Sequence, residues 1–385
     1  MQISSFLRGS WQLNKTDKCN IATFVDEITQ EMQHKGKFLL LIILLGTACF
    51  GQVSTITIWK DSVIGAVYNK ATSSVVYGRP DKNGNYKIYI SDTLGNNETP
   101  LTYAGWRQDR HQWAHAWDPS GKYLFCYVEK AEYVKEKGHK RKPVDAIPGY
   151  GAYTDLWLIT RDGKKAWQLT NVPNNYNSGI IHSAISQDGK MYAWTERIKA
   201  PQFSMALAAG TYVFRVADIV FDSVPHFANI RTFQPGNVPA SCELESISPD
   251  NTTLAFYSTF ETKNLFATPI YTLNMITGKT TRLTWESFAQ CPVYTTDGKS
   301  LIYMTGAGCD IFPFQIQGAD WWLMDTNGMN KKRLTFMNVK DNPQSVNRYR
   351  LAGSISFMSD NSFLGGVMTK PLGLTGMTVK VVFQR

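Results

Sequence analysis

Short runs in which apolar and polar residues alternate recur along the chain, each directly after an acidic turn. "KYLFCYVE", "KMYAWTE", "TTLAFYST" and "KSLIYMTG" all alternate with period 2, as half-buried β-strands do. The turns before them combine Asp with Gly, Asn or Ser, residues that tolerate positive φ or cap a tight hairpin. The pattern predicts antiparallel strand pairs joined by acidic turns. The turns lie at Asp118, Asp188, Asp250, Asp297 and Asp360.

A second pair of strands completes each unit. Four segments share a strand, a Gly-bearing turn and a further strand that ends in Leu-Thr, and "IYTLNMITGKTTRLT" is one of them. A unit of four short strands in roughly 40–50 residues is typical of a β-propeller blade. The Leu-Thr copies end at Thr102, Thr170, Thr284 and Thr335, with a weaker copy near Thr232.

Counting these units gives six blades, so the sequence predicts an all-β, six-bladed β-propeller of four-stranded blades. The first blade uses "SVVYGRP" and "KIYISDT" without an acidic turn. The strand Ser54–Lys60 is expected to close the ring by joining the last blade, whose own ending is short. Closure of this kind leaves no long free sheet edge to aggregate.

The units resemble the WD40-like repeats of the TolB type, whose wording is close to "SPDGKxIxF" followed by "IYxMDxxGxxxxRLT". The resemblance covers Val75–Thr335 well and the final blade loosely. It implies a six-bladed propeller in the bacterial periplasm or at the cell surface. TolB also carries an α/β domain before its propeller, which binds partner proteins. We expect no such domain in this chain and therefore do not transfer the role of TolB to it.

Composition narrows the class of protein. Only 18% of the residues are charged, against roughly 25% in an average soluble domain. The formal net charge of +9 is spread along the chain, so we expect no nucleic-acid partner. Charged residues are concentrated in one segment, Glu129–Pro143. We interpret this segment as a solvated loop at the rim of the propeller, and the alternative is a functional loop, because long loops often carry function. The motifs G-x-S-x-G, H-E-x-x-H and G-x-x-x-x-G-K-[ST] are absent, which argues against a serine hydrolase, a zincin and a P-loop enzyme.

The N-terminal region has the pattern of a leader rather than of a domain. "KGKFLLLIILLGTACFGQ" at Lys35–Gln52 combines two lysines, a short apolar run and small residues, as secretory signals do. We expect residues 1–31 to be a gene-model extension, with the cytoplasmic tail of a signal anchor as the alternative. Residues 32–51 are expected to be a signal peptide and residues 52–385 the propeller. The mature chain is then expected in the periplasm or at the cell surface, without a membrane span.

Export changes how the cysteines are interpreted. Signal cleavage before Gln52 is favoured over a lipid anchor at Cys49, because the lipobox around Cys49 is imperfect. The cysteines that remain would lie in a compartment that permits disulfides. None has C-x-x-C spacing, so a zinc or redox motif is not expected. Buried free thiols are the first expectation, and a Cys291–Cys309 disulfide is the alternative. The four are Cys126, Cys242, Cys291 and Cys309.

Candidate site residues lie where the first strand of each blade would line the central channel. These strands converge in a propeller, so polar side chains near their starts should open onto one channel mouth. Imidazoles with carboxylates could bind a divalent metal or act as an acid–base pair, while His and Arg beside Trp could hold an acidic sugar or peptide. The third interpretation is structural: the same groups hydrogen-bond strand ends and channel water. The candidates are His111, Trp113, His115, His182, Glu243, Glu245, Gln290, Arg348 and Arg350.

The sequence favours a binding function. We expect an exported TolB-like propeller that acts as a binding or scaffold module for an envelope protein or an oligosaccharide, as a monomer and without an obligatory cofactor. The alternative is a polysaccharide-active enzyme, a lyase or hydrolase, with its site at the channel mouth and a divalent metal as one option. No spacing in the chain is diagnostic of a metal site, so both functions stay open at this point.

Overall fold

The computed structural model of this protein describes residues 54–384, apart from 133–134, 136–139, 141, 147–150, 203–209, 265, 287, 310–317, 346–349 and 370–375. The start at Met32, the signal segment, the lipidation position Cys49 and the candidate Arg348 lie outside the described residues, and Glu129–Pro143 is described only in part. No helix in the described part of the chain is long and apolar enough to cross a membrane.

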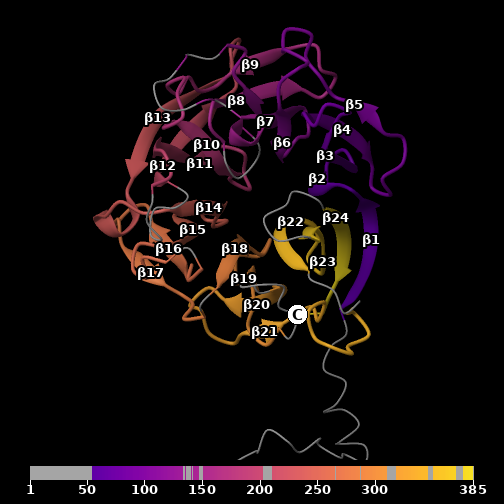
Figure 1. Ribbon diagram of the computed structural model, residues 1–385, viewed down its shortest axis with the longest axis vertical. Coiled ribbons are helices and arrows are strands. Elements are labelled where there is room, and N and C mark those ends of the chain that lie inside the picture. The colour runs from indigo at the N-terminus through magenta and orange to yellow at the C-terminus, as the bar shows by residue number, and fades with distance from the viewer. Residues whose placement is uncertain are drawn as a thin grey trace, which may run out of the picture. The chain divides into compact units, whose positions relative to one another are not determined.

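Six four-stranded antiparallel sheets follow one another around a ring (Figure 1), which confirms the predicted six-bladed propeller. In the first five blades, the order of the strands in the sheet is their order in the chain. Blade 1 consists of β2 (Ile64–Asn69), β3 (Ser74–Pro80), β4 (Tyr86–Asp92) and β5 (Thr99–Pro100). Blade 2 consists of β6 (Gln112–Trp117), β7 (Tyr123–Glu129), β8 (Thr154–Thr160) and β9 (Ala166–Gln168). Blade 3 consists of β10 (Gly179–Ile185), β11 (Met191–Lys199), β12 (Thr211–Val220) and β13 (His226–Phe233).

The remaining three blades have the same form, and short 3₁₀ turns occur in two connections. These turns are η2 (Pro143–Ala146) and η3 (Pro235–Asn237). Blade 4 consists of β14 (Cys242–Ile247), β15 (Thr253–Ser258), β16 (Ile270–Asn274) and β17 (Thr280–Arg282). Blade 5 consists of β18 (Ala289–Tyr294), β19 (Ser300–Thr305), β20 (Asp320–Asp325) and β21 (Lys332–Arg333). Blade 6 consists of β22 (Leu351–Ser359), β23 (Ser362–Met368), β24 (Gly376–Val382) and β1 (Thr55–Asp61).

The last blade is completed by the first strand of the described chain. β1 runs antiparallel to β24, with Thr55 opposite Val382, so the order of this sheet is β1-β24-β23-β22. Trp59 of β1 also packs edge-on against Tyr77 of blade 1, with the ring centroids 5.7 Å apart. The predicted closure by the N-terminal strand is thus confirmed. β1 pairs with the edge of β24 that would otherwise be open.

Each acidic turn joins the first and second strands of its blade, as predicted. In blade 4, Ser248 Oγ donates to Asp250 Oδ1 at 2.5 Å and accepts from the backbone N–H of Thr253 at 2.9 Å. Ser186 in blade 3 and Thr295 in blade 5 make the same two bonds. The hydroxyl therefore ties both ends of the hairpin together, which explains why Ser or Thr stands two residues before the Asp in these blades.

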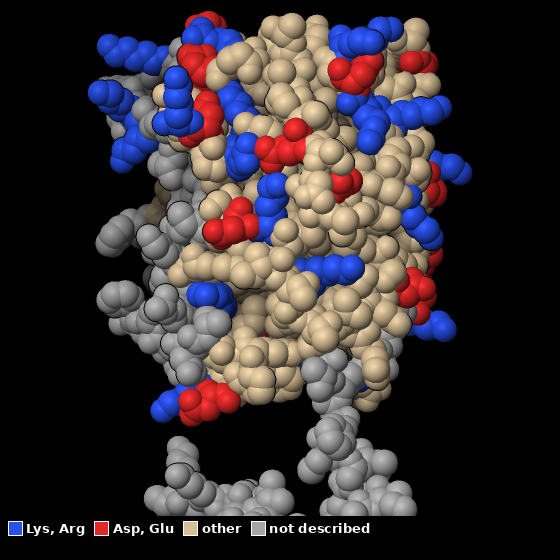
Figure 2. All heavy atoms as spheres, turned by 90° about the vertical axis from the view of Figure 1, so that its right-hand side faces the viewer, with Lys and Arg blue, Asp and Glu red and all other residues tan. Residues whose placement is uncertain are grey.

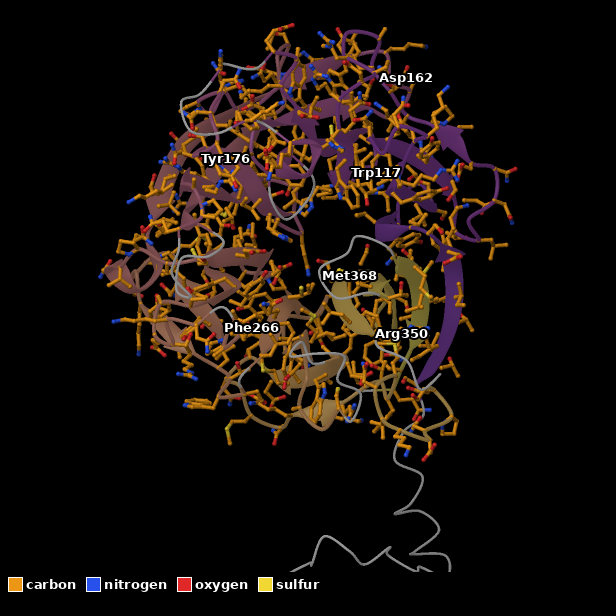
Figure 3. All side chains as sticks on the ribbon, in the orientation of Figure 1. Trp117, Asp162, Tyr176, Phe266, Arg350 and Met368 are labelled. Atoms are coloured by element: carbon orange, nitrogen blue, oxygen red, sulfur yellow. The ribbon has the colours of Figure 1, made fainter. Side chains whose placement is uncertain are left out.

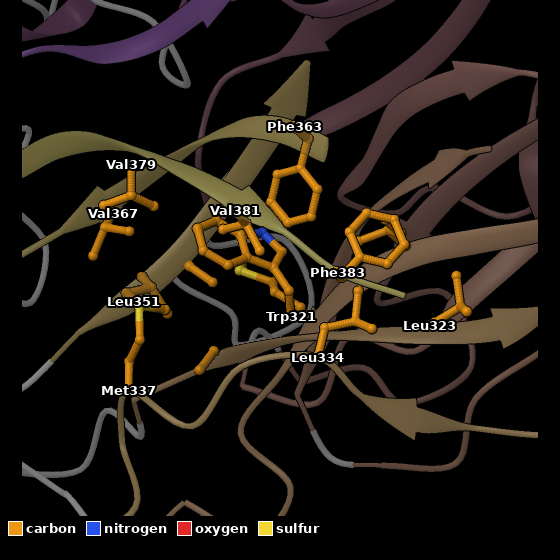
Figure 4. Close-up of a cluster of buried hydrophobic side chains, with 14 residues drawn as sticks. Trp321, Leu323, Leu334, Met337, Leu351, Phe363, Val367, Val379, Val381 and Phe383 are labelled. Carbon is orange, nitrogen blue, oxygen red and sulfur yellow. The ribbon is translucent and has the colours of Figure 1, made fainter. Parts of the chain in front are cut away.

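Apolar side chains fill the space between neighbouring blades. One cluster surrounds Trp321 of β20, which is 1% exposed and packs edge-on against Phe363 of β23 at 5.2 Å (Figure 4). The Nε1–H of Trp321 donates to Gly353 O at 2.9 Å. The next residue, Trp322, is only partly buried, and Arg333 lies over its ring at 5.8 Å. The strand alternation thus places one ring of the pair in the core and leaves the other partly exposed.

The cysteines correct one alternative of the sequence analysis. All four cysteines in the described part of the chain are free thiols, so the Cys291–Cys309 disulfide is wrong. Cys309 instead lies against a buried ion pair, with its sulfur 3.5 Å from Asp320 Oδ2 and 3.5 Å from Arg333 Nη2.

The surface carries charges of both signs. On the face seen in Figure 2, Lys and Arg side chains lie among Asp and Glu side chains and wide uncharged areas. The formal net charge of +9 is therefore not gathered into one basic field on this face.

Candidate functional site

The first strands of neighbouring blades contact one another around the centre of the ring, and each carries a β-bulge. The pairing register between the first and second strands shifts in all six blades. A bulge re-aims the side chain of its extra residue. Residues further along a blade lie outward, as Asp162 between β8 and β9 does at the rim (Figure 3). Five of the six bulges include a polar or thiol side chain: His115, His182, Glu245, Cys291 and Ser354.

Three of the predicted residues meet between blades 3 and 4. His182 of β10 has its Nε2 3.0 Å from Glu243 Oε2 and its Nδ1 3.6 Å from Glu245 Oε1. One donor atom from each residue lies within 4.8 Å of the other two. The side chains of His182, Glu243 and Glu245 are 21%, 15% and 4% exposed. We call these three residues the channel triad.

Neighbouring groups contact the two carboxylates of the channel triad. Tyr257 of β15 donates its hydroxyl hydrogen to Glu243 Oε2 at 2.5 Å. Cys291 of β18 interacts with Glu245 and with Ser354 of β22. Glu245 Oε1 nonetheless has no hydrogen-bond partner among the residues that the structure describes. A buried carboxylate oxygen without a donor is costly, so this atom is poised to accept a further group.

The carboxylates change the protonation of His182. Burial lowers the pKa of this imidazole, but the charges of Glu245 and Glu243 outweigh that effect and raise the pKa to about 9. Burial raises the pKa of Glu245 to about 7, an increase that the nearby His182 partly opposes. At neutral pH the imidazole of His182 is therefore protonated, and it pairs with Glu243.

His115 of β6 adds a second imidazole near the triad. Its Nε2 bonds to Ser183 O, one residue from His182, and its ring centroid lies 5.0 Å from that of Tyr127. Burial lowers the pKa of His115 to about 4, so at neutral pH the ring is neutral and its Nε2–H donates. Ser183 Oγ shares hydrogen bonds with Tyr127 and Tyr192 at 2.8 and 2.7 Å. The bond to Ser183 O ties His115 to the backbone of β10.

His111 and Trp113 do not join the channel triad. His111 is buried, and its Nδ1 accepts a hydrogen bond from the backbone N–H of Tyr86 at 3.1 Å. Trp113 packs at the interface of blades 1 and 2, where a Cβ on Gly78 would lie 2.8 Å from its ring. His111 and His182 stand seven and six residues before the Asp of their acidic turns, and this similar spacing predicts that both open onto one cavity. In blade 2 the bulge lies at His115, closer to the turn, so the spacing does not transfer.

Gln290 and Arg350 are placed by contacts within and between blades. Gln290 Nε2 donates to Thr268 Oγ1 at 3.0 Å. The backbone N–H of Arg350 donates to Asn338 Oδ1 at 3.0 Å, and its carbonyl accepts from Ala319 N at 3.1 Å. The structure thus brings together His182 and the two glutamates, with His115 nearby.

Sequence reasoning missed Tyr257, Cys291 and Ser354. Cys291, Ser354 and His182 each stand six residues before the Asp of their acidic turn. This shared spacing is a signal by which the first two could be found. Tyr257 lies on a second strand, where the repeat gives no comparable mark.

The channel triad offers one imidazole and two carboxylates, and the side chains of His182 and Glu243 are partly exposed. Such a donor set can bind a divalent transition metal, hydrogen-bond a polar ligand, or act as an acid–base pair. The perturbed pKa values of His182 and Glu245 mark the triad as the candidate functional site of the described chain.

Several solved structures resemble this fold at low sequence identity. TolB from Acinetobacter baumannii is 15% identical to this chain, with a TM-score of 0.45. The match covers 83% of this chain and 63% of the TolB chain, so this chain spans less than two thirds of the length of that TolB. A putative TolB from Agrobacterium tumefaciens is also 15% identical, with a TM-score of 0.45 over 84% and 81% of the two chains. An oligogalacturonate lyase from Vibrio parahaemolyticus is 13% identical, with a TM-score of 0.44 over 86% and 97%.

At these identities the likeness concerns the fold alone. No protein-family model matches the chain, and no curated protein matches its sequence.

Proposed function

We propose that this chain is an exported TolB-type propeller that works as a binding module at the cell envelope and takes its ligand at the channel triad. The observation that carries the proposal is that His182 and two glutamates from the adjacent blade converge on one another. Buried polar groups with a structural role are in most cases hydrogen-bonded. Glu245 Oε1 is without such a partner among the described residues.

The chemistry of the triad favours a ligand rich in hydrogen-bonding groups. Carboxylate oxygens accept from hydroxyls and amides, and a protonated imidazole donates. The hydroxyls of an oligosaccharide and the backbone of a protein loop both supply such groups, and a protein loop or sugar chain can enter a channel mouth. The leader-like segment Lys35–Gln52 supports export, and hence a ligand of the periplasm or cell surface.

A second candidate function is a polysaccharide-active enzyme, a lyase or hydrolase. It is favoured by the chain of hydrogen-bonding groups from Tyr257 to Glu243 to His182, with contacts of 2.5 and 3.0 Å. Such a chain can hold and move a proton at His182 Nε2, as acid–base catalysis requires. The same site therefore serves both candidate functions. Only the enzyme would convert a polysaccharide into products, so a test for product formation distinguishes the two.

The test compares the wild-type protein with His182→Ala and a matched control. In the control, His226→Ala, the replaced imidazole lies 3.7 Å from Asp222 and is 51% exposed. We expect a panel of acidic and neutral oligosaccharides, and envelope proteins in pull-down, to yield a ligand that raises the melting temperature of the wild type and of the control. His182→Ala should bind that ligand at least tenfold more weakly.

Two outcomes decide between the alternatives. A ligand that binds His182→Ala as tightly as the wild type would place the binding site elsewhere and overturn the proposal. Release of unsaturated or reducing sugars by the wild type, lost in His182→Ala, would establish the enzyme instead.

A further inference from the structure

We propose that the channel triad is a binding site for a divalent first-row metal ion such as Zn²⁺ or Mn²⁺, with His182, Glu243 and Glu245 as its protein ligands. This inference rests on the proposed function, because the metal would occupy the same site and supply part of its affinity. It starts from donor atoms that come from two blades and lie within 4.8 Å of one another.

The separations suit a shared ion. Two donor atoms that each lie about 2.1 Å from one ion are roughly 3.0 Å apart when they bind at right angles and roughly 3.4 Å apart in a tetrahedral arrangement. On opposite sides of the ion they are at most about 4.2 Å apart. His182 Nε2 and Glu243 Oε2 are 3.0 Å apart, which fits the first value without movement. The three donor atoms lie within 4.8 Å of one another, so binding requires the carboxylate of Glu245 to move toward the other two ligands.

Glu245 is the second, independent observation. Its side chain is 4% exposed, and its Oε1 points at His182 without a hydrogen-bond partner in the described chain. Two carboxylates face one imidazole in a poorly hydrated place. A cation bound among them satisfies the unpaired Oε1 of Glu245.

A neighbouring residue orients one of the proposed metal ligands, Glu243. Tyr257 donates to Glu243 Oε2 at 2.5 Å, and hydrogen bonds of this kind orient metal-binding carboxylates.

The donor set selects the class of ion. Ca²⁺ and Mg²⁺ prefer oxygen ligands alone, whereas imidazole with carboxylates suits Zn²⁺, Mn²⁺ and Fe²⁺. Three protein ligands leave at least one position of the ion open. A hydroxyl or carboxylate of the proposed ligand can fill that position, so metal binding and ligand binding are expected to strengthen each other.

The experiment measures metal binding directly on the full chain. Protein stripped with a chelator is titrated with Zn²⁺ alone and with Mn²⁺ alone by calorimetry, and bound metal is counted by mass spectrometry after dialysis. We expect one ion per chain in the wild type and in His226→Ala. His182→Ala and the nearly isosteric Glu245→Gln should each bind at least tenfold more weakly. Circular dichroism of the stripped proteins shows whether each variant is folded.

The outcomes separate this inference from the proposed function. Failure of the wild type to bind either ion, or equal affinity in a folded Glu245→Gln variant, overturns the metal site. If an oligosaccharide or protein ligand still binds the stripped wild type at the triad, the binding function stands and the metal inference alone fails. If one ion binds but no ligand does, the metal site stands and the proposed function falls.

Discussion

Threonine and serine hydroxyls of the repeated motifs take the place of backbone hydrogen bonds at the ends of strands. Thr284, which closes the Leu-Thr of blade 4, accepts from the backbone N–H of Ile270 at 2.8 Å. Thr170 and Thr335 do the same in blades 2 and 5. The motif that identifies the repeat in the sequence therefore has a structural role, since it is also present in blades 2 and 5, which add no residue to the channel triad.

At this scale we predict that Thr284→Val lowers the free energy of unfolding by about 1–3 kcal/mol, because the buried N–H of Ile270 loses its acceptor. Thr284 is 0% exposed, so water cannot replace the hydroxyl. Thr284→Ser keeps the oxygen and should retain most of the stability. Thr281→Val, on an exposed position of β17, is the control, with an expected change within about 0.5 kcal/mol. Denaturant unfolding compares the variants, and equal losses at Thr284 and Thr281 would contradict the role of the hydroxyl.

Strands were predictable in number and order, whereas the bulges within them were not. Alternation and turn chemistry are local and recur in every blade, so the sequence predicts four strands per unit and the position of each acidic turn. A bulge depends on how one strand pairs with its neighbour and bends around the ring, and few residues mark it. For this reason the sequence predicted His182, Glu243 and Glu245 together but also grouped them with His111, and it missed Cys291.

The bulge of β18 leads to a prediction about Cys291, whose φ is 52°. A β-branched residue is strained in this left-handed region, at a cost on the order of 1–3 kcal/mol. Cys291→Val should therefore destabilise the protein by that amount more than Cys126→Val, the same change at a buried position of β7 with no positive φ. Cys291→Gly should be tolerated better than Cys291→Val, since Gly adopts positive φ freely. Thermal unfolding measures all three, and equal costs for the two valine variants would show that the bulge relaxes around either side chain.

On the scale of the whole ring, closure depends on β1, the first strand that the structure describes. Without β1, the outer edge of β24 would be unpaired and Trp59 would leave its contact with Tyr77 in blade 1. A last blade that contains β1 couples the first blade to the last, so all six blades should unfold together.

The last prediction tests this closure by truncation. A chain that begins at Ser62 lacks β1, and a chain that begins at Gln52 keeps it. β1 pairs with β24 at six positions, and at a net value of about 1 kcal/mol per hydrogen bond its loss should cost on the order of 3–6 kcal/mol. We expect the chain from Gln52 to unfold in one transition and the chain from Ser62 to melt at a lower temperature, with the last blade opening first. Hydrogen exchange should show that opening as lost protection in β22–β24, while β10 and β14 stay protected. If the two chains melt together with the same exchange pattern, the ring is held by blade packing alone, and β1 is an ordinary edge strand.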